Sequence, residues 1–378
     1  MKLELIATTT FGLEAPVKRE IEALGYKIIK SEDGKITFSG DERAVAKANL
    51  WLRCADRIQI KMAEFMAYEF EDLFQQVKAI PWEQWIPPEG KFIVNGSSVK
   101  SKLSSVPACQ SVAEKAVVEK LKETYAIDYF EKTGALYDIK ITLLKDRVTV
   151  TLDTTGPGLH KRGYRENAVI APIKETLASA MINLSFWRPG RILVDPCCGS
   201  GTLAIEAAMI GRNMAPGLNR SFVSEDWEAI PSKFWEEERA KAVEEIDREH
   251  PLEIYASDVD KKAISVAMEN ASQAGVLKDI NFTVADANKL QSGGKEGGII
   301  ITNPPYGERI GDQESIDKLY EGFAGFIQKN PTWSMYAITP DKTIEEKVFK
   351  RPADRRRKLF NGRMEVCYYQ YHGKKPKA

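Results

Sequence analysis

Apolar segments that alternate with amphipathic segments from residue 190 onward constrain the fold of this chain more than any other feature. The expected strands RILVD, LEIYAS, INFTVA, GGIIIT and WSMYAIT alternate with the expected helices TLAIEAAMIG, KKAISVAMENASQAG and KLYEGFAGFIQKN. Such a pattern predicts a mostly parallel sheet with helices on both faces. Asn361-Gly362, between two later strand-like runs, predicts an antiparallel hairpin. We therefore expect an α/β fold whose parallel sheet is closed by that hairpin.

The first 155 residues indicate two smaller α+β units. Residues 1–65 have the order strand, helix, strand, strand, helix, strand, which is that of the ferredoxin-like unit. Within them Asp33-Gly34 indicates a hairpin and Asp41 a helix cap. Residues 66–155 add two helices and three strands, and Gly156-Pro157-Gly158 then marks a boundary. We expect domains over residues 1–65, 66–155 and 165–378.

Composition narrows the classes of protein that this chain can belong to. It has 54 basic and 54 acidic residues, so any surface that binds nucleic acid must be local. Five cysteines without metal-ligand spacing indicate a reducing cytoplasm and no structural zinc, and three scattered histidines add no metal site. No run approaches the roughly 18 apolar residues of a membrane span. We expect a cytoplasmic protein that binds neither a metal nor a membrane.

A turn with two glycines follows the first strand of the expected parallel sheet. In VDPCCGSGTLAIEAA, Gly199 and Gly201 permit a tight turn and close approach of the backbone to a ligand, before a helix starts near Thr202. The motif is neither GxGxxG nor a P-loop, so neither a dinucleotide nor a triphosphate is favoured. Asp195, at the strand end, can hold an ammonium group or orient the turn, and Cys197 shapes it. Such a turn alone does not establish a cofactor site.

Two acidic residues close the next two expected strands. Asp258 can accept hydrogen bonds from both hydroxyls of a ribose, as acids do in dinucleotide folds. The charged insertion over residues 212–253 explains its unusual distance from the glycine turn. Asp286 can accept from the exocyclic amine of adenine. Each acid alone could be a helix cap, but ligands of open α/β sheets bind at the carboxyl ends of the strands. The three strand ends together predict a cofactor that contains a nucleoside.

Asn-Pro-Pro-Tyr, residues 303–306, closes the fourth expected strand beside the same crevice. Two prolines remove two backbone donors and fix two φ angles, which is more rigidity than a turn needs. A planar exocyclic amine is a poor nucleophile, so a site that alkylates it must hold both of its N–H groups. Asn303 Oδ1 and the fixed carbonyl of Pro304 can accept those hydrogens, and Tyr306 can stack on the base. In isolation the motif could be a strand-terminating turn.

Two short basic segments are candidates for contacts to RNA. Lys100 and Lys102 lie among serines in VKSKLSSVPACQ and could contact phosphates. In HKRGYR, Lys161, Arg162 and Arg165 surround a tyrosine that could stack on a base. The alternatives are a solvated loop in the first case and an exposed linker in the second. The residues alone leave both alternatives open.

These motifs resemble a known family. DPCCGSG matches the cofactor loop, and NPPYG the amino-methylation motif, of class I S-adenosylmethionine-dependent methyltransferases, and residues 165–378 resemble that domain. Through KSKLSSVPACQ, HKRGYR and KLFNGRMEV, the whole chain resembles THUMP-domain rRNA guanine-N2 methyltransferases of the large-subunit type. The resemblance implies a Rossmann-like catalytic sheet, preceded by a ferredoxin-like domain and an RNA-binding THUMP domain that can begin near residue 44.

The resemblance also implies the ligands. They are S-adenosylmethionine as cofactor, S-adenosylhomocysteine as product, and RNA as partner, in particular 23S rRNA or its assembly intermediates. The segment APIKETLASAM would cover the methionine end of the cofactor. The expected cofactor-binding residues are Asp195, Cys197, Gly199, Ser200, Gly201, Thr202, Asp258, Asp286, Ala287, Asn303, Pro172 and Thr176.

The expected reaction is direct methyl transfer to guanine N2 of a base that is flipped into the crevice. Asn303, Pro304 and Tyr306 are the expected catalytic residues, and the proton is lost to water. Because other amino-methylases share the Asn-Pro-Pro-Tyr motif, an adenine-N6 methyltransferase acting on DNA or RNA stays open. A non-catalytic RNA-binding assembly factor is a further alternative, although the intact turn, both acids and Asn303 count against it.

Overall fold

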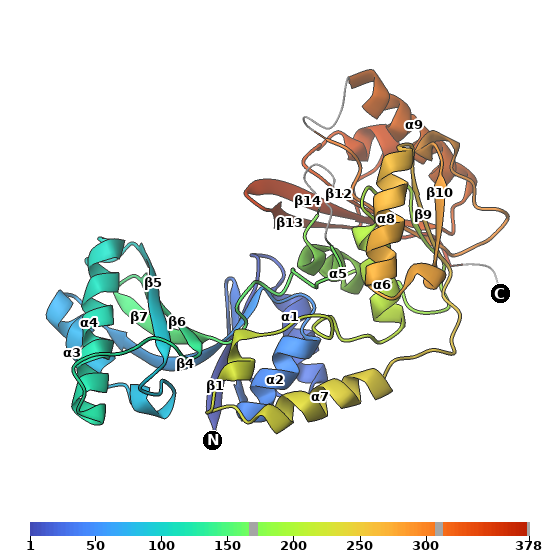
Figure 1. Ribbon diagram of the computed structural model, residues 1–378. Helices are drawn as coiled ribbons and strands as arrows, with labels where there is room; N and C mark the ends of the chain where they lie inside the picture. Colours follow the sequence, from blue (N-terminus) through green and yellow to red (C-terminus); the bar gives the residue numbers. More distant parts are fainter. Residues whose placement is uncertain (166–172, 307–312, 376–378) are drawn as a thin grey trace. The chain divides into compact units, whose positions relative to one another are not determined.

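The computed structural model describes residues 1–165, 173–306 and 313–375, and it divides into two compact units (Figure 1). The first unit comprises Met1–Thr9, Val17–Leu159 and Ser221–Lys241. The second comprises Thr10–Pro16, His160–Arg220 and Ala242–Ala378. Each unit is built on one seven-stranded sheet.

The N-terminal elements confirm the expected ferredoxin-like order. β1 pairs antiparallel with β3 and with β4, and β2 pairs with β3 across a turn in which Gly34 has a φ of +74°. Asp41 caps the second helix, because its Oδ1 accepts from the backbone N–H of Ala44 at 2.9 Å. The elements are β1 (Leu3–Thr8), α1 (Glu14–Ala23), β2 (Lys27–Glu32), β3 (Lys35–Gly40), α2 (Glu42–Trp51) and β4 (Arg57–Met66).

The following elements extend the same sheet. β4 pairs with β7, which gives the strand order β2-β3-β1-β4-β7-β6-β5. The two expected N-terminal domains therefore share one continuous sheet. The long helix α4 begins at Val106, directly after the segment that carries Lys100 and Lys102. The added elements are α3 (Phe70–Lys78), η1 (Trp82–Gln84), β5 (Lys91–Val99), α4 (Val106–Tyr125), β6 (Leu136–Leu144) and β7 (Arg147–Asp153).

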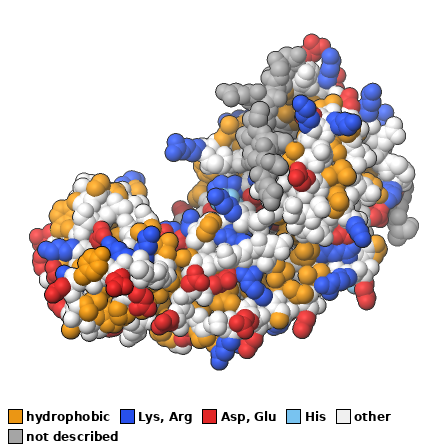
Figure 2. Space-filling model, viewed as in Figure 1, with side chains coloured by type: hydrophobic (Ala, Val, Ile, Leu, Met, Phe, Trp, Pro, Cys, Tyr) orange, Lys and Arg blue, Asp and Glu red, His pale blue; other side chains and the backbone are white. Residues whose placement is uncertain are grey.

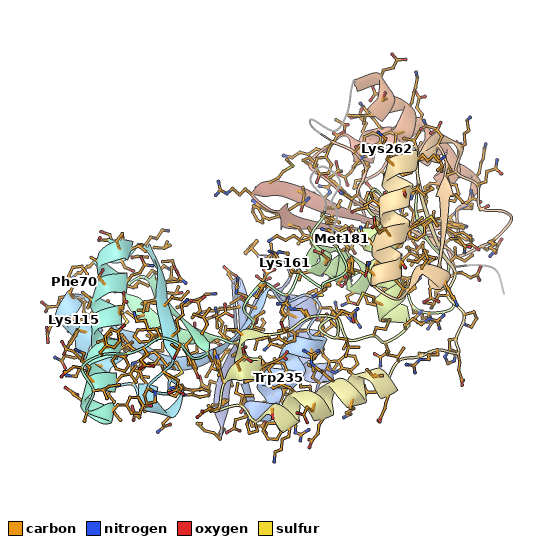
Figure 3. The ribbon with its side chains drawn as sticks, viewed as in Figure 1. Phe70, Lys115, Lys161, Met181, Trp235 and Lys262 are labelled. Atoms are coloured by element: carbon orange, nitrogen blue, oxygen red, sulfur yellow. The ribbon has the colours of Figure 1, made fainter. Side chains whose placement is uncertain are left out.

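Half of the charged insertion, residues 221–241 of 212–253, belongs to the first unit, and none of it forms a strand of the catalytic sheet. It forms η2 (Val223–Asp226) and α7 (Ser232–Glu244). Trp227 stacks on Tyr137 of β6 at a centroid distance of 4.8 Å and donates its indole N–H to a backbone carbonyl of β6 at 2.9 Å. Arg43 of α2 pairs with Glu238 of α7 at 2.9 Å, and Figure 3 labels Trp235 where these two helices meet.

We expect a fragment that starts near residue 160 to aggregate unless the inserted segment is removed. Trp227 is 1% exposed in the full chain and stacks on Tyr137, which the fragment lacks, so its ring becomes exposed. A fragment in which a short Gly/Ser linker replaces residues 221–241 should stay monomeric and melt cooperatively. Size-exclusion chromatography and melting curves of the two fragments test this, and equal behaviour of both would contradict the assignment of the segment to the first unit.

The second unit confirms the expected α/β fold. Its strand order is β10-β9-β8-β11-β12-β14-β13, in which the first five strands are parallel and β14 runs antiparallel to both of its neighbours. α6 and α8 pack beside β9 and β10 (Figure 1), while α9 packs with β11 and β12 in a core that includes Ile300, Phe323 and Met335.

The elements of the second unit are α5 (Glu175–Asn183), β8 (Leu193–Asp195), α6 (Thr202–Gly211), β9 (Ile254–Asp258), α8 (Lys261–Gln273), η3 (Leu277–Asp279), β10 (Ile280–Val284), η4 (Ala287–Lys289), β11 (Ile299–Thr302), α9 (Gln313–Lys329), β12 (Ser334–Thr339), the π-helical turn η6 (Glu345–Phe349), β13 (Arg355–Asn361) and β14 (Met364–Tyr371). In the described part of the chain, no helix is long and apolar enough to cross a membrane.

Candidate active site

Four strand ends form a row at one edge of the second sheet. β10, β9, β8 and β11 are adjacent and parallel, so their carboxyl ends meet at that edge. Asp286, Asp258, Asp195 and Asn303 stand at these ends in that order. With about 4.8 Å between neighbouring strands, the row is roughly 14 Å long. The structure thus brings together the residues that the sequence predicted for one ligand crevice.

The glycine turn is held in place by the neighbouring strand and helix. Gly199 and Gly201 have φ values of +53° and +82°, which favour glycine. A Cβ at Gly201 would lie 3.0 Å from the Cβ of Ala267, so α8 packs directly against the turn. The Asn270 side chain of α8 donates to the Ser200 carbonyl at 3.1 Å. The conformation of the turn therefore depends on residues that are distant in the sequence.

Asp258 orders the glycine turn and is not the cap of the following helix. Asp260 caps α8, because its Oδ1 accepts from the Lys262 N–H at 2.8 Å. Asp258 accepts from the N–H of Gly199 at 2.9 Å and from the N–H of Asp260 at 3.0 Å. A carboxylate has about four acceptor sites, so capacity remains for ribose hydroxyls. Asp286 does act as a cap, because it accepts from the Asn288 N–H at the start of η4.

Asp195 is buried at the centre of the row. Burial raises the pKa of its carboxyl to about 7, and the nearby charge of Asp258 acts in the same direction. A cation bound beside it would favour the ionised form again, so the site suits a ligand with a positively charged group. Burial also raises the pKa of the Cys197 thiol well above its usual range. Cys197 is therefore a neutral side chain within the turn.

Asn303 presents an unsatisfied acceptor at the end of β11. Its side chain is 9% exposed, and Oδ1 has no hydrogen-bond partner among the described residues. A buried polar atom without a partner costs about 1–3 kcal/mol, which is acceptable where a ligand supplies the missing donor. Pro304 is buried beside it, and the Tyr306 hydroxyl accepts from Asn361 Nδ2 at 3.2 Å.

The expectation that Arg162 contacts RNA and that Tyr164 stacks on a base is wrong. Both residues are 2% exposed and face Glu206 of α6, which is fully buried. The Tyr164 hydroxyl donates to Glu206 at 3.1 Å, and the Arg162 guanidinium lies 3.4 Å from the same carboxylate. Ser179 of α5 donates to Glu206 as well. These four residues form a buried polar cluster, here called the Glu206 cluster, that fastens the linker to α5 and α6.

Arg165 is also engaged inside the second unit, so the expected phosphate contact does not fit its position. It pairs with Glu175 at 3.3 Å and donates to the Thr202 hydroxyl. It thereby joins the first turn of α5 to the first turn of α6, beside the glycine turn. Thr176, next to Glu175, is 2% exposed, and Pro172 lies outside the described residues. Lys161, Lys100 and Lys102 are exposed and stay candidates for RNA contacts.

A cavity beside Asp286 was not anticipated from the sequence. Its volume is about 520 Å³, and its lining includes Asp286 and Ala287 together with the apolar side chains of Val194, Leu290 and Trp333. These residues come from three separate segments that no motif links, so only the fold shows that they meet. Among the described residues, no group of three potential metal ligands occurs.

Known families match three parts of the chain. A family described as the RMKL-like methyltransferase domain matches residues 162–370, more than half of the chain. The chain belongs to the RMKL-like methyltransferase family. An RlmL ferredoxin-like domain matches residues 4–59, and a THUMP domain matches residues 67–153. The matches confirm the expected three-part architecture.

Relatives of this RMKL-like methyltransferase agree with that membership. A Bacillus subtilis protein named "Putative RNA methyltransferase YpsC" is 48% identical over 99% of this chain and 97% of its own length. The crystal structure of SMU.472 in complex with SAH has a TM-score of 0.94, is 41% identical and covers 100% of this chain and 99% of that chain. A Listeria monocytogenes protein called a "predicted N6-adenine-specific DNA methylase" has a TM-score of 0.94 at 44% identity, over 99% of this chain and 97% of that one.

These comparisons confirm the expected enzyme class, a methyltransferase, and the expected cofactor, S-adenosylmethionine. The RMKL-like enzyme is an S-adenosylmethionine-dependent methyltransferase of an RNA methyltransferase family. The row and the glycine turn fit such a cofactor, because they combine two turn glycines at positive φ, a carboxylate with remaining acceptor capacity and a buried acid suited to a cationic group.

We expect Asp258→Ala to weaken S-adenosylmethionine binding by about 1.5–3 kcal/mol, the scale of a lost hydrogen bond to a charged group. The variant removes an acceptor at the expected ribose position and also releases the Gly199 N–H. Calorimetric titration measures the effect. Asp260→Ala is the matched control, because it removes the cap of α8 and should lower the melting temperature while leaving cofactor affinity unchanged. Equal affinity of both variants would remove Asp258 from the cofactor site.

Proposed function

We propose that the enzyme methylates the exocyclic N2 amine of a guanine in 23S rRNA or in its assembly intermediates, in the cytoplasm. The observation that supports an amine substrate is the buried and unpartnered Oδ1 of Asn303, at the edge that also carries Asp195 and Asp258. The sequence resemblance to large-subunit rRNA guanine-N2 methyltransferases supports the base and the RNA.

In this proposal Asn303 Oδ1 and the Pro304 carbonyl accept the two hydrogens of the amine and aim its nitrogen. Tyr306 stacks on the flipped base, and its hydrogen bond with Asn361 holds the ring in position. S-adenosylmethionine supplies an electrophilic methyl group when it is bound. Positive charge develops on the amine nitrogen, where the two fixed acceptors stabilise it. Asparagine cannot take a proton, so we infer that the proton leaves to water.

The row and its surroundings hold the cofactor in this proposal. Asp258 accepts from the ribose, Asp286 from the adenine amine beside Ala287, and Asp195 faces the cationic end of the cofactor. The other proposed contacts are Cys197, Gly199, Ser200, Gly201, Thr202, Asn303, Thr176 and Pro172. We also propose that residues 1–65, 66–155 and 165–378 act as ferredoxin-like, THUMP and catalytic domains, and that Lys100, Lys102 and Lys161 bind RNA.

An adenine-N6 methyltransferase is the second candidate. Adenine N6 also presents two hydrogens to a pair of acceptors, and the Listeria relative is named for that activity on DNA. Transfer of labelled methyl groups to a 23S rRNA transcript and to unmethylated double-stranded DNA separates the substrates. We expect the transcript to be labelled, and nuclease digestion should then release the label as N2-methylguanosine. Label in DNA alone, or in N6-methyladenosine, would contradict the proposal.

A further inference from the structure

The C-terminal hairpin overhangs the edge of the sheet that carries the proposed active site. Thr339, the last residue of β12, pairs with Cys367, so Met364–Val366 and their partners Leu359–Asn361 continue past that edge. At about 3.3 Å per residue, the overhang is roughly 10 Å long. Figure 1 shows β13 and β14 as a two-stranded arm of the second unit. β12 alone separates β14 from β11 in the sheet, so the hairpin tip lies on the same side of the sheet as the carboxyl end of β11, which Asn303 follows.

One face of the tip contacts the Asn-Pro-Pro-Tyr motif. Asn361 Nδ2 donates to the Tyr306 hydroxyl at 3.2 Å, and Leu359 on the same face is fully buried. Because side chains alternate along a strand, Lys358 and Phe360 occupy the other face. The Lys358 Nζ lies 5.6 Å from the centre of the Phe360 ring.

A loop from the N-terminus packs against the edge strand β13 of the hairpin. Thr10–Pro16 belongs to the second unit, although β1 before it belongs to the first. Gly12 has a φ of +91°, and a Cβ there would lie 2.8 Å from the Lys358 carbonyl. This close approach places Phe11 edge-on to Phe360, with ring centroids 6.4 Å apart at an angle of 71°. Phe11 is nevertheless 48% exposed, which is unusual for a ring in such a fixed place.

The tip is also strongly basic. Residues 355–363 carry five basic and no acidic side chains in a chain whose net charge is zero. Arg363, next to Gly362 at the turn, is exposed and makes no ion pair within the described residues. Lys358 pairs with Glu365 at 2.7 Å, but both side chains are more than half exposed, so the pair is weak. Figure 2 shows Lys and Arg side chains at the free end of this hairpin.

We propose that Phe11, Lys358, Phe360 and Arg363, here called the tip surface, bind the unpaired RNA strand that flanks the target nucleotide. Flipping a base unstacks its neighbours, and the exposed ring of Phe11, supported by the partly buried ring of Phe360, offers a neighbouring base a new stacking partner. Lys358 and Arg363 bind the phosphates on either side. The inference rests on the proposed RNA substrate, and it assigns to the first loop of the chain a role in substrate binding at the methyltransferase unit.

The test compares two double variants of the full-length enzyme on a 23S rRNA transcript. Phe11→Ala with Arg363→Ala removes the tip surface. Phe186→Ala with Arg188→Ala is the matched control, because both side chains are exposed and precede β8, at the opposite edge of the same sheet. We expect the first variant to raise the KM for RNA roughly tenfold or more, the loss of one stacked base and one phosphate contact. The kcat, the cofactor affinity and the melting temperature should stay at wild-type values, and the control should match wild type throughout.

Conservative variants separate recognition from structure. Phe11→Tyr keeps the ring and Arg363→Lys keeps the charge, so both should retain most of the RNA affinity. The proposal is overturned if wild type methylates the transcript but the tip variant and the control have the same KM for RNA. That result would leave the proposed RNA methyltransferase function intact. It is also overturned if the conservative variants lose as much RNA affinity as the alanine variants. Absence of methyl transfer to RNA by wild type would overturn the proposed function along with it.

Discussion

Asn303→Ala should lower the single-turnover rate of methyl transfer by at least about 100–1000-fold, the cost of removing one preorganised hydrogen-bond partner from a transition state. The variant deletes the buried Oδ1 that the structure leaves without a partner among its described residues. Cofactor affinity should change little, because the amide oxygen is assigned to the substrate amine although Asn303 also borders the cofactor site. Rapid-quench measurement with saturating cofactor gives the rate, and calorimetry gives the affinity.

Asn281→Ala is the matched control for this variant. Asn281 is an exposed asparagine near the amino end of β10 in the same sheet, far along the strand from the carboxyl-end row. Its variant should turn over at the wild-type rate. If Asn303→Ala transfers methyl groups at the wild-type rate, Asn303 does not bind the substrate amine. If the variant loses transfer rate and cofactor affinity together, Asn303 is a cofactor-binding residue.

Arg162→Ala should destabilise the protein by about 3–5 kcal/mol, the usual cost of leaving a buried charge without its partner. Glu206 is fully buried, and Arg162 is the cation that faces it. Because whole domains are stable by only about 5–15 kcal/mol, the variant should melt at a much lower temperature or fail to accumulate as folded protein. Chemical denaturation followed by circular dichroism measures the loss.

Lys161→Ala should affect RNA binding and not stability, the reverse of Arg162→Ala. Lys161 is exposed next to Arg162 (Figure 3), so its removal should leave stability within about 0.5 kcal/mol of wild type. It should weaken RNA binding and make the salt dependence shallower by about one unit. An Arg162→Ala protein with wild-type stability and weakened RNA binding would restore Arg162 to the RNA surface and contradict its place in the Glu206 cluster.

The sheet and the row of strand ends could be predicted because their signals are local. Buried parallel strands are continuous apolar runs, and glycines or prolines at a strand end impose their conformation wherever the chain goes. The role of Asp258 was harder to predict. Asp258 and Asp260 stand two positions apart ahead of the same helix, and only the structure shows that Asp260 is the cap while Asp258 reaches the Gly199 N–H.

The Glu206 cluster could not be predicted from HKRGYR alone, because the sequence of a basic segment does not show whether it is solvated or buried against an acid. The helix TLAIEAAMIG, however, indicated that a buried acid needs a partner. Glu206 is the only acid in the apolar helix TLAIEAAMIG, and acids are almost never fully buried without a partner. Likewise, the charged insertion packs on the first unit through Trp227, which stacks on Tyr137, and sequence spacing does not encode that pairing.

The most direct test of the proposed function is nucleoside mass spectrometry of 23S rRNA from a strain that lacks the gene. The account predicts that one N2-methylguanosine is lost, that the wild-type gene restores it, and that a gene encoding Asn303→Ala does not. Unchanged N2-methylguanosine, accompanied by a loss of N6-methyladenosine in RNA or in genomic DNA, would contradict the assignment and identify the enzyme as an adenine-N6 methyltransferase.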